Sequence, residues 1–231
     1  MCGRYAITLP PEAMRKLFGF VEQPNFPPRY NVAPTQPVPI VRANDGQRRF
    51  GLVRWGFLPG FVKDPKAFPL IINARAEGIT AKPSFRAAMR RRRCLFIADG
   101  WYEWRRLAGA GLKVVKQPFL LRRRDRAPMG FAGLYETWSD PQGGEIETGC
   151  IVTTSANAAT VAVHDRMPVI LDPKDFDRWL DCSSDKADPA LDLMRPAPDD
   201  LIEFFEVSSA VNSYKSDGPQ LQAPTGRANL I

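Results

Sequence analysis

The stretch CLFIADGWYEWRR, residues 94–106, decides the fold class of this chain. Apolar and aromatic residues lie on both sides of Asp99-Gly100, which predicts two strands, Cys94–Ala98 and Trp101–Arg106. The sequence beyond them predicts further strands at Pro118–Arg123, Gly130–Thr137, Thr148–Thr154 and Leu201–Val207. Residues 140–144 (DPQGG) are turn formers between two of these strands.

The sequence before this stretch predicts more short elements. Residues 2–8 form a strand, and residues 38–41 and 50–55 form a hairpin around Asn44-Asp45-Gly46. Pro10-Pro11-Glu12 opens a short helix, and Ser84 can cap a second one that runs into the arginines at 90–93. These arginines favour two interpretations equally, compensation of the helix dipole on a solvated face and contact with DNA.

Short helices are also expected after Asp172-Pro173 and over residues 189–195. Many short strands with few helices, and no internal repeat or dividing linker, predict a single α+β domain. We expect a curved, mainly antiparallel, barrel-like sheet with peripheral helices. The domain is expected to span residues 1–217. Residues 218–231, which are rich in Gly, Pro and Gln, are expected to form a flexible tail.

Composition narrows the class of protein. The 231 residues are 44% hydrophobic and 25% charged, with a net charge of +7, so a polyanionic partner and a generally basic surface are both consistent. The four widely spaced cysteines and single histidine argue against a metal site and for free thiols in a reducing compartment. No signal or membrane segment is recognisable. We therefore expect a cytoplasmic (nucleoid-associated, if bacterial), non-secreted monomer that needs no metal, cofactor or membrane.

Cys2 follows the initiator methionine directly. Removal of Met1 would leave an α-amine of pKa about 8 and a thiol of pKa about 8.5 on one residue. The amine of such a 1,2-aminothiol can condense with an aldehyde, and the thiol can then close a thiazolidine ring. Taken alone, Cys2 is better explained by tolerance of any small residue at this position.

Two further segments carry groups suited to proton transfer. Glu103 lies between two large aromatics, Tyr102 and Trp104, and an apolar surround raises the pKa of a carboxyl toward neutrality. His164 is the only histidine and precedes Asp165-Arg166, so it is a candidate to shuttle protons. The simpler alternatives are a strand glutamate that faces solvent and a loop histidine with satisfied hydrogen bonds.

Three polar segments suggest binding. Arg4 lies one strand period from Cys2, where its charge suits a phosphate. Residues 29–36 (RYNVAPTQ) form a loop rich in hydrogen-bonding groups, either a site or a structural turn. Period two places Asn73, Arg75 and Glu77 on one face of a strand, as a polar site or an internal ion-pair network.

Taken together, these segments resemble the SRAP family, the SOS response-associated peptidases or abasic-site processing proteins. The resemblance spans nearly the whole chain in order. It rests on MCGRY (1–5), RYNVAPTQ (29–36), RWGFLP (54–59), NARAE (73–77), RCLFIADGWYEW (93–104), FAGLYE (131–136), TTSAN (153–157), HDRMPVIL (164–171) and VSSAVNSYKSDGP (207–219). With it, the simple explanation of Cys2 becomes the weaker one.

The resemblance implies a sensor of abasic sites in single-stranded DNA. Cys2, freed of Met1, would form a Schiff base and then a thiazolidine with the ring-opened sugar, which protects the site as a DNA–protein crosslink. Asn73, Glu103 and His164 match the catalytic asparagine, glutamate and histidine of the family. The family also implies abasic-site lyase activity as a side reaction and removal of Met1 by autoproteolysis.

The DNA-binding residues implied by the resemblance are Arg4, Arg75 and Arg166, near the DNA backbone. Stacking or wedging groups are also needed, and Phe61 and Phe68 in the loop over 56–70 are the candidates. Some family members have paired tryptophans near this loop, where this chain has Phe61-Val62.

Two other functions remain open. A thiol peptidase or amidase would use Cys2 as an N-terminal nucleophile on other substrates. A non-catalytic reader of single-stranded DNA or of modified bases would bind reversibly, in a salt-sensitive way.

Overall fold

A computed structural model describes residues 2–108, 114–140, 142–184 and 187–225. The strands are β1 Tyr5–Ile7, β2 Arg29–Val32, β3 Pro37–Asn44, β4 Gln47–Trp55, β5 Asn73–Arg75, β6 Arg93–Ala98, β7 Gly100–Ala108, β8 Val114–Arg123, β9 Met129–Ser139, β10 Glu145–Ser155, β11 Arg166–Pro168, β12 Ile170–Leu171 and β13 Ile202–Glu206. The α-helices are α1 Pro11–Phe18, α2 Pro83–Arg91, α3 Phe176–Leu180 and α4 Asp188–Leu191, and the 3-10 helices are η1 Pro173–Asp175, η2 Ser209–Asn212 and η3 Pro219–Gln222.

Five strands close into a barrel. The pairings run β10–β4–β3–β6–β9, and β9 pairs again with β10. Most pairs are antiparallel, but β4 and β5 each run parallel to β10. Closure brings side chains close to the backbone at Gly133 in β9, where a Cβ atom would lie 2.4 Å from the Phe96 ring. Only a glycine accommodates the ring at this distance.

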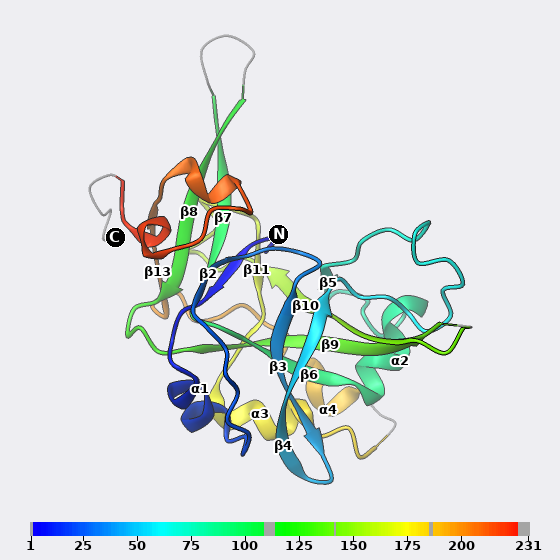
Figure 1. Cartoon of the computed structure of the whole chain (residues 1–231). Helices are drawn as coiled ribbons and strands as arrows, with labels where there is room; N and C mark the ends of the chain where they lie inside the picture. Colours follow the sequence, from blue (N-terminus) through cyan, green and yellow to red (C-terminus); the bar gives the residue numbers. More distant parts are fainter. Residues whose placement is uncertain (1, 109–113, 141, 185–186, 226–231) are drawn as a thin grey trace.

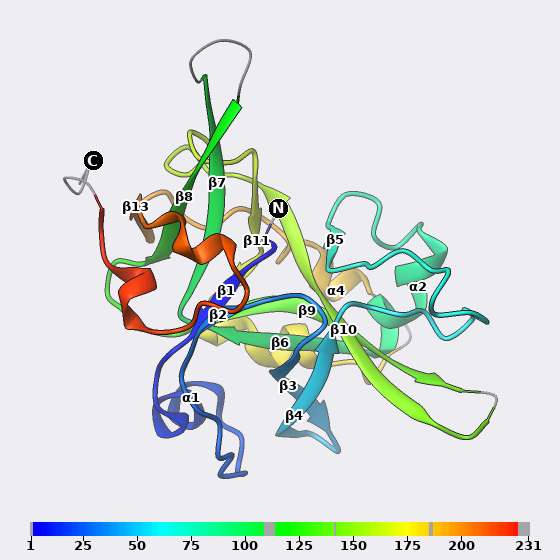
Figure 2. The same cartoon turned by 45° about the horizontal axis from the view of Figure 1, so that its top comes forward.

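A second sheet lies beside the barrel, with strand order β13–β8–β7–β1–β2. The β7–β8 hairpin extends well beyond the barrel, and the N-terminus lies near the base of its projecting part (Figures 1 and 2). β1 pairs with β7 only at Gly100 and Trp101. The N–H of Tyr102 then donates to the Arg4 carbonyl at 2.9 Å, and beyond this bond no described strand pairs with β7 on the β1 side.

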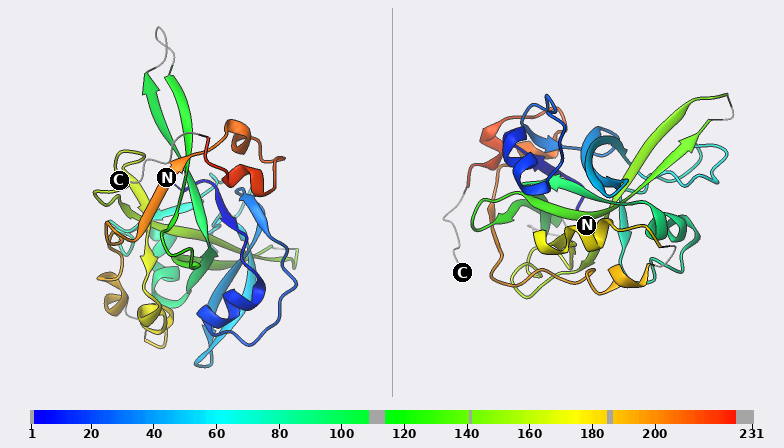
Figure 3. Two further views of the ribbon diagram at one scale, coloured as in Figure 1. Left: turned by 90° about the vertical axis from the view of Figure 1, so that its left-hand side faces the viewer. Right: turned by 90° about the horizontal axis from the view of Figure 1, so that it is seen from below.

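The helices are peripheral. α1 and α3 lie at the end of the molecule opposite the β7–β8 hairpin (Figure 3), where Phe18 and Phe176 stack with ring centres 5.3 Å apart. Tyr5 of β1 reaches into the main core and contacts Trp55 edge to face at 5.0 Å. The contact of Tyr5 with Trp55 of β4 packs the N-terminal strand, and with it the segment that carries Cys2, against the barrel. Of the described helices, none has the length and apolar character needed to cross a membrane.

The predicted single α+β domain with a barrel-like sheet is confirmed, and each predicted strand overlaps an observed one. Ser84 was predicted to cap α2, but the helix begins one residue earlier at Pro83, after Lys82. Residues 218–225 do not form part of a free tail: η3 buries Leu221, and Pro224 bridges to Val207. The remainder of the expected tail lies outside the described residues.

Candidate active site

Cys2 lies just before β1, and its side chain is fully buried. Its carbonyl oxygen accepts a hydrogen bond of 2.9 Å from Nδ2 of Asn73. Asn73 is the first residue of β5, which the parallel pairing with Ile151 of β10 holds in place. Oδ1 of Asn73 is buried and accepts no hydrogen bond from the described residues. The asparagine therefore orients Cys2 and retains one polar atom for a further partner.

Glu103 projects from β7 toward the same point. Its side chain is almost fully buried, and this burial, with the charge of Asp165, raises the pKa of Glu103 to about 7. The pKa of the Cys2 thiol is also raised, first by burial and then by the negative charge of Glu103. The thiol is therefore protonated at neutral pH, and a carboxyl able to accept its proton lies nearby.

His164 completes the group from the loop before β11. Its Nε2 lies 3.9 Å from Oε2 of Glu103. The backbone N–H of Arg166 donates to its Nδ1 at 3.0 Å, so the neutral imidazole carries its proton on Nε2, toward Glu103. Oδ1 of Asp165 lies 2.9 Å from the same Nδ1 and would accept a proton placed there. Burial lowers the pKa of His164, which favours the neutral ring.

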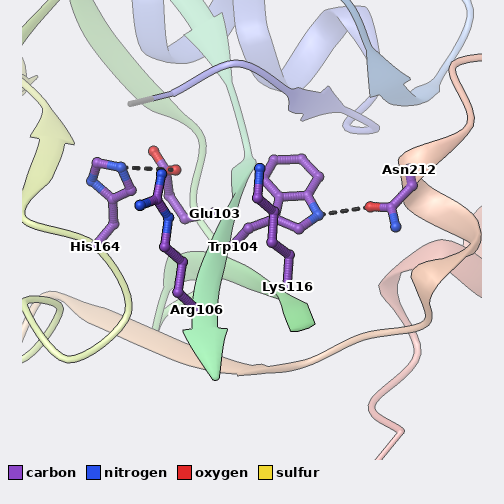
Figure 4. Close-up of a pocket in the computed structure, with 6 residues that line it drawn as sticks. All are labelled: Glu103, Trp104, Arg106, Lys116, His164 and Asn212. Atoms are coloured by element: carbon purple, nitrogen blue, oxygen red, sulfur yellow. Dashed lines mark hydrogen bonds and ion pairs between the residues drawn. The ribbon is translucent and has the colours of Figure 1, made fainter. Parts of the chain in front are cut away.

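The four predicted catalytic residues thus meet, although they come from four separate parts of the chain. Glu103 and His164 line a pocket of about 410 Å³, together with Trp104, Arg106, Lys116 and Asn212 (Figure 4). Nε1 of Trp104 donates to Oδ1 of Asn212 at 2.7 Å. The sequence analysis did not identify four of these pocket residues as part of the site: Trp104, Arg106, Lys116 and Asn212. Trp104 and Asn212 lie in quoted motifs, but Lys116 is placed here only by the β7–β8 register.

The arginines predicted to bind DNA differ in their surroundings. Arg75 is exposed at the end of β5. Arg4 donates from Nη1 to Oδ1 of Asn31 at 2.8 Å and to the Val211 carbonyl at 3.0 Å. Arg166 forms a two-pronged ion pair with Glu77 at 2.7 and 2.9 Å. Arg75 is therefore available to solvent, whereas Arg4 and Arg166 already have protein partners.

The loop over 56–70 places its two aromatic candidates differently. Phe61 is 62% exposed. Phe68 packs against a small cluster made of Leu58, Val62 and Trp138. The first is available for contact with a ligand, and the second supports the loop.

One residue in each of two polar segments makes structural hydrogen bonds within the protein. Asn31 of the RYNVAPTQ loop donates to the carbonyls of Ser213 and Ser216 at 2.9 and 2.8 Å, which fastens the C-terminal region to β2. Arg93, predicted to belong to an arginine run on a solvated face or on DNA, is instead 2% exposed within β6. Its guanidinium donates to main-chain carbonyls of four other residues, Met89, Arg90, Trp179 and Asp181.

All four cysteines are free. Within the described ranges, no three His, Cys, Asp or Glu side chains gather as metal ligands would.

The fold, with these side chains gathered around Cys2, is that of a family of DNA-processing proteins. The family described as "SOS response associated peptidase (SRAP)" matches residues 1–214, and the chain belongs to this family. It is 37% identical over 224 residues to the abasic site processing protein YoqW of Bacillus subtilis, covering 96% of this chain and 98% of that protein. It is 31% identical over 231 residues to the abasic site processing protein YedK of Escherichia coli, covering 97% and 100%.

A solved structure agrees with the fold. The crystal structure of a protein from Bacteroides thetaiotaomicron superposes with a TM-score of 0.84 at 25% sequence identity, covering 96% of this chain and 99% of that one.

Proposed function

We propose that this protein recognises abasic sites in single-stranded DNA and bonds to them covalently through Cys2. The observation that carries the proposal is the convergence of Asn73, Glu103 and His164 on a buried N-terminal cysteine. The relatives named for abasic site processing support the same substrate. We also propose that the protein acts in the cytoplasm and as a monomer.

The reaction requires that the Met1–Cys2 peptide bond first be hydrolysed, because an amide nitrogen cannot form an imine. The freed amine adds to the aldehyde carbon of the ring-opened sugar, and the oxygen leaves as water. The sulfur then bonds to the imine carbon, the thiol proton passes to a base, and the imine nitrogen takes up a proton. One water is released for each thiazolidine formed.

The surrounding residues supply the proton transfers. Glu103, with a pKa of about 7, is able to accept the thiol proton and to donate a proton to the departing oxygen. His164 presents its Nε2–H toward the same carboxylate and is placed to donate to the sugar oxygen. Asn73 holds the Cys2 carbonyl, so that amine and thiol keep a fixed orientation toward the sugar.

The other predicted contacts belong to the same proposal. Arg75, Arg4 and Arg166 favour a phosphate backbone near the site by their charge, and Phe61 offers an exposed ring for a base. The imine also makes the neighbouring sugar carbon acidic, so loss of a proton and elimination of the next phosphate give lyase activity. Hydrolysis of Met1–Cys2 by the chain itself would be its peptidase activity.

Intact-protein mass spectrometry tests the proposal. Protein lacking Met1 is mixed with a single-stranded oligonucleotide that contains one abasic site. We expect a species that survives denaturation without borohydride and has gained the oligonucleotide mass less one water. The Cys2→Ala variant should form no such species, whereas Cys182→Ser, which changes another free thiol, should react like the wild type.

Other outcomes separate the alternatives. Reversible, salt-sensitive binding without an adduct would instead support a non-catalytic reader of single-stranded DNA. Turnover of a peptide panel without any adduct would favour the thiol peptidase. Retention of Met1 in the Glu103→Gln variant, but not in the wild type, would assign Met1 removal to the chain itself.

A further inference from the structure

The pocket beside Glu103 and His164 contains two cations that the mechanism above does not use. Arg106 of β7 and Lys116 of β8 are direct cross-strand neighbours in the hairpin. Both side chains line the pocket that Glu103 and His164 also line. Figure 4 shows them rising from the two strands toward the same end of this pocket.

Arg106 and Lys116 differ from a neighbouring arginine, which forms an ion pair with a carboxylate. Arg105, the residue before Arg106, pairs with Glu206 at 3.6 Å. Within the described part of the chain, no carboxylate forms an ion pair with Arg106 or Lys116. Like charges placed directly opposite each other on a sheet repel. An anion held between them would remove this repulsion.

Arg106 lies close enough to act on His164. Burial is the main cause of the lowered pKa of His164, and the positive charge of Arg106 adds to it. Glu103 and His164 are where the sugar reacts, and a sugar within a DNA strand carries a phosphate on each side. A sugar bound at that end of the pocket brings one of its phosphates to the neighbouring wall.

We propose that Arg106 and Lys116 form a subsite for the DNA phosphate adjacent to the reacting abasic sugar. This inference rests on the function proposed above. Arginine offers two parallel N–H donors to phosphate oxygens, and lysine adds a point charge. The subsite would set the position of the sugar relative to Cys2, in addition to the general attraction of a basic surface for DNA.

Neutral linkages test the contact directly. A set of single-stranded oligonucleotides carries one abasic site and a single uncharged methylphosphonate at successive positions on either side. At one position next to the abasic site, replacing the charged phosphate by the neutral linkage should slow adduct formation by the wild type about tenfold. Arg106→Gln and Lys116→Gln should each slow the reaction with the all-phosphate strand and be less sensitive than the wild type to neutralisation of that same linkage.

Two matched controls remove other charges. Arg86→Gln on α2 and Lys16→Gln on α1 change exposed cations and should retain the wild-type sensitivity to every linkage.

The second substrate is 2-deoxyribose, an aldehyde sugar without phosphate. Wild type and Arg106→Gln should react with it at rates within about twofold of each other.

The outcomes are distinct. If Arg106→Gln slows the reaction with 2-deoxyribose as much as with DNA, the arginine acts on the catalytic residues and the subsite is wrong. If each neutral linkage slows wild type and variants equally, neither cation contacts a phosphate. If the wild type reacts with neither substrate, the proposed crosslinking function itself fails.

Discussion

Glu103 and His164 face each other with 3.9 Å between Oε2 and Nε2, in a position where burial disfavours the charged form of both. The pKa of the carboxyl is raised to about 7, and that of the imidazole is lowered. The usual order of the two pKa values is therefore reversed, with that of the carboxyl above that of the imidazole. Near neutral pH the carboxyl is able both to accept and to donate a proton, while the imidazole is neutral.

The raised pKa of Glu103 predicts a pH-dependent stability. The unfolded carboxyl has a pKa of 4.5 and the folded one about 7, so the folded state binds the proton more tightly. The stabilisation of the folded state by proton binding at Glu103 is complete below pH 4.5 and is lost as the pH rises through 7. From pH 5 to pH 8, Glu103→Gln should gain about 2 kcal/mol in free energy of unfolding relative to the wild type.

Denaturant unfolding of both proteins at several pH values measures this difference. Other titrating groups largely cancel in the comparison, because the two chains share them. A difference between variant and wild type that stays constant from pH 5 to pH 8 would mean that Glu103 has an ordinary pKa, and the proton-transfer role would lose its basis.

The hydrogen bond from Asn73 to the Cys2 carbonyl predicts an effect on rate rather than on stability. Asn73→Ala leaves the carbonyl free to turn, so adduct formation should slow by about 10- to 100-fold. Asn73→Asp places a carboxylate against a carbonyl oxygen and should slow it further. Single-turnover kinetics measures both, with Asn44→Ala in the exposed β3–β4 turn as control. Equal rates for Asn73→Ala and the control would mean that Asn73 has no part in adduct formation.

The sequence predicted the strands well because their apolar runs are local. Residues 94–98 are buried along their whole length, which a continuous apolar run indicates without knowledge of the neighbouring strands. The catalytic residues were found by motifs around them. Their meeting at Cys2 depends on pairings such as β5 with β10, which no local pattern contains.

Charged residues were the hardest to interpret. Arg93 follows three other arginines in the sequence, yet its guanidinium donates to the carbonyls of Trp179 and Asp181, more than 80 residues away. Arg4 likewise reaches Val211. The type of a cation does not tell whether its partner is a phosphate or a distant carbonyl. Only the fold decides this.

The burial of Arg93 predicts a large effect on stability. Arg93→Met removes the donors to four main-chain carbonyls and should lower the free energy of unfolding by about 3 kcal/mol. Arg90→Met, on the exposed side of the same arginine run, should change it by less than about 0.5 kcal/mol. Equal effects of the two variants in urea denaturation would mean that Arg93 is solvated.

The two aromatic residues of the loop over 56–70 predict opposite results. Phe61 is 62% exposed and contributes little to folding, so Phe61→Ala should leave the melting temperature within about 2 °C of the wild type. If its ring stacks on a base, the same variant should bind single-stranded DNA about 5- to 100-fold more weakly. Phe68 packs on Val62 and Trp138, so Phe68→Ala should lower the melting temperature instead.

Binding is best measured with an uncleavable analogue of the abasic sugar that lacks an aldehyde, in the Cys2→Ala background, so that covalent capture does not obscure the affinity. Weaker binding by Phe61→Ala at an unchanged melting temperature identifies Phe61 as the stacking residue. If binding falls only in Phe68→Ala, and in proportion to its loss of stability, the loop acts through its shape. The exposed ring of Phe61 then has no part in holding DNA, and Trp104 in the pocket wall is the next aromatic residue to test.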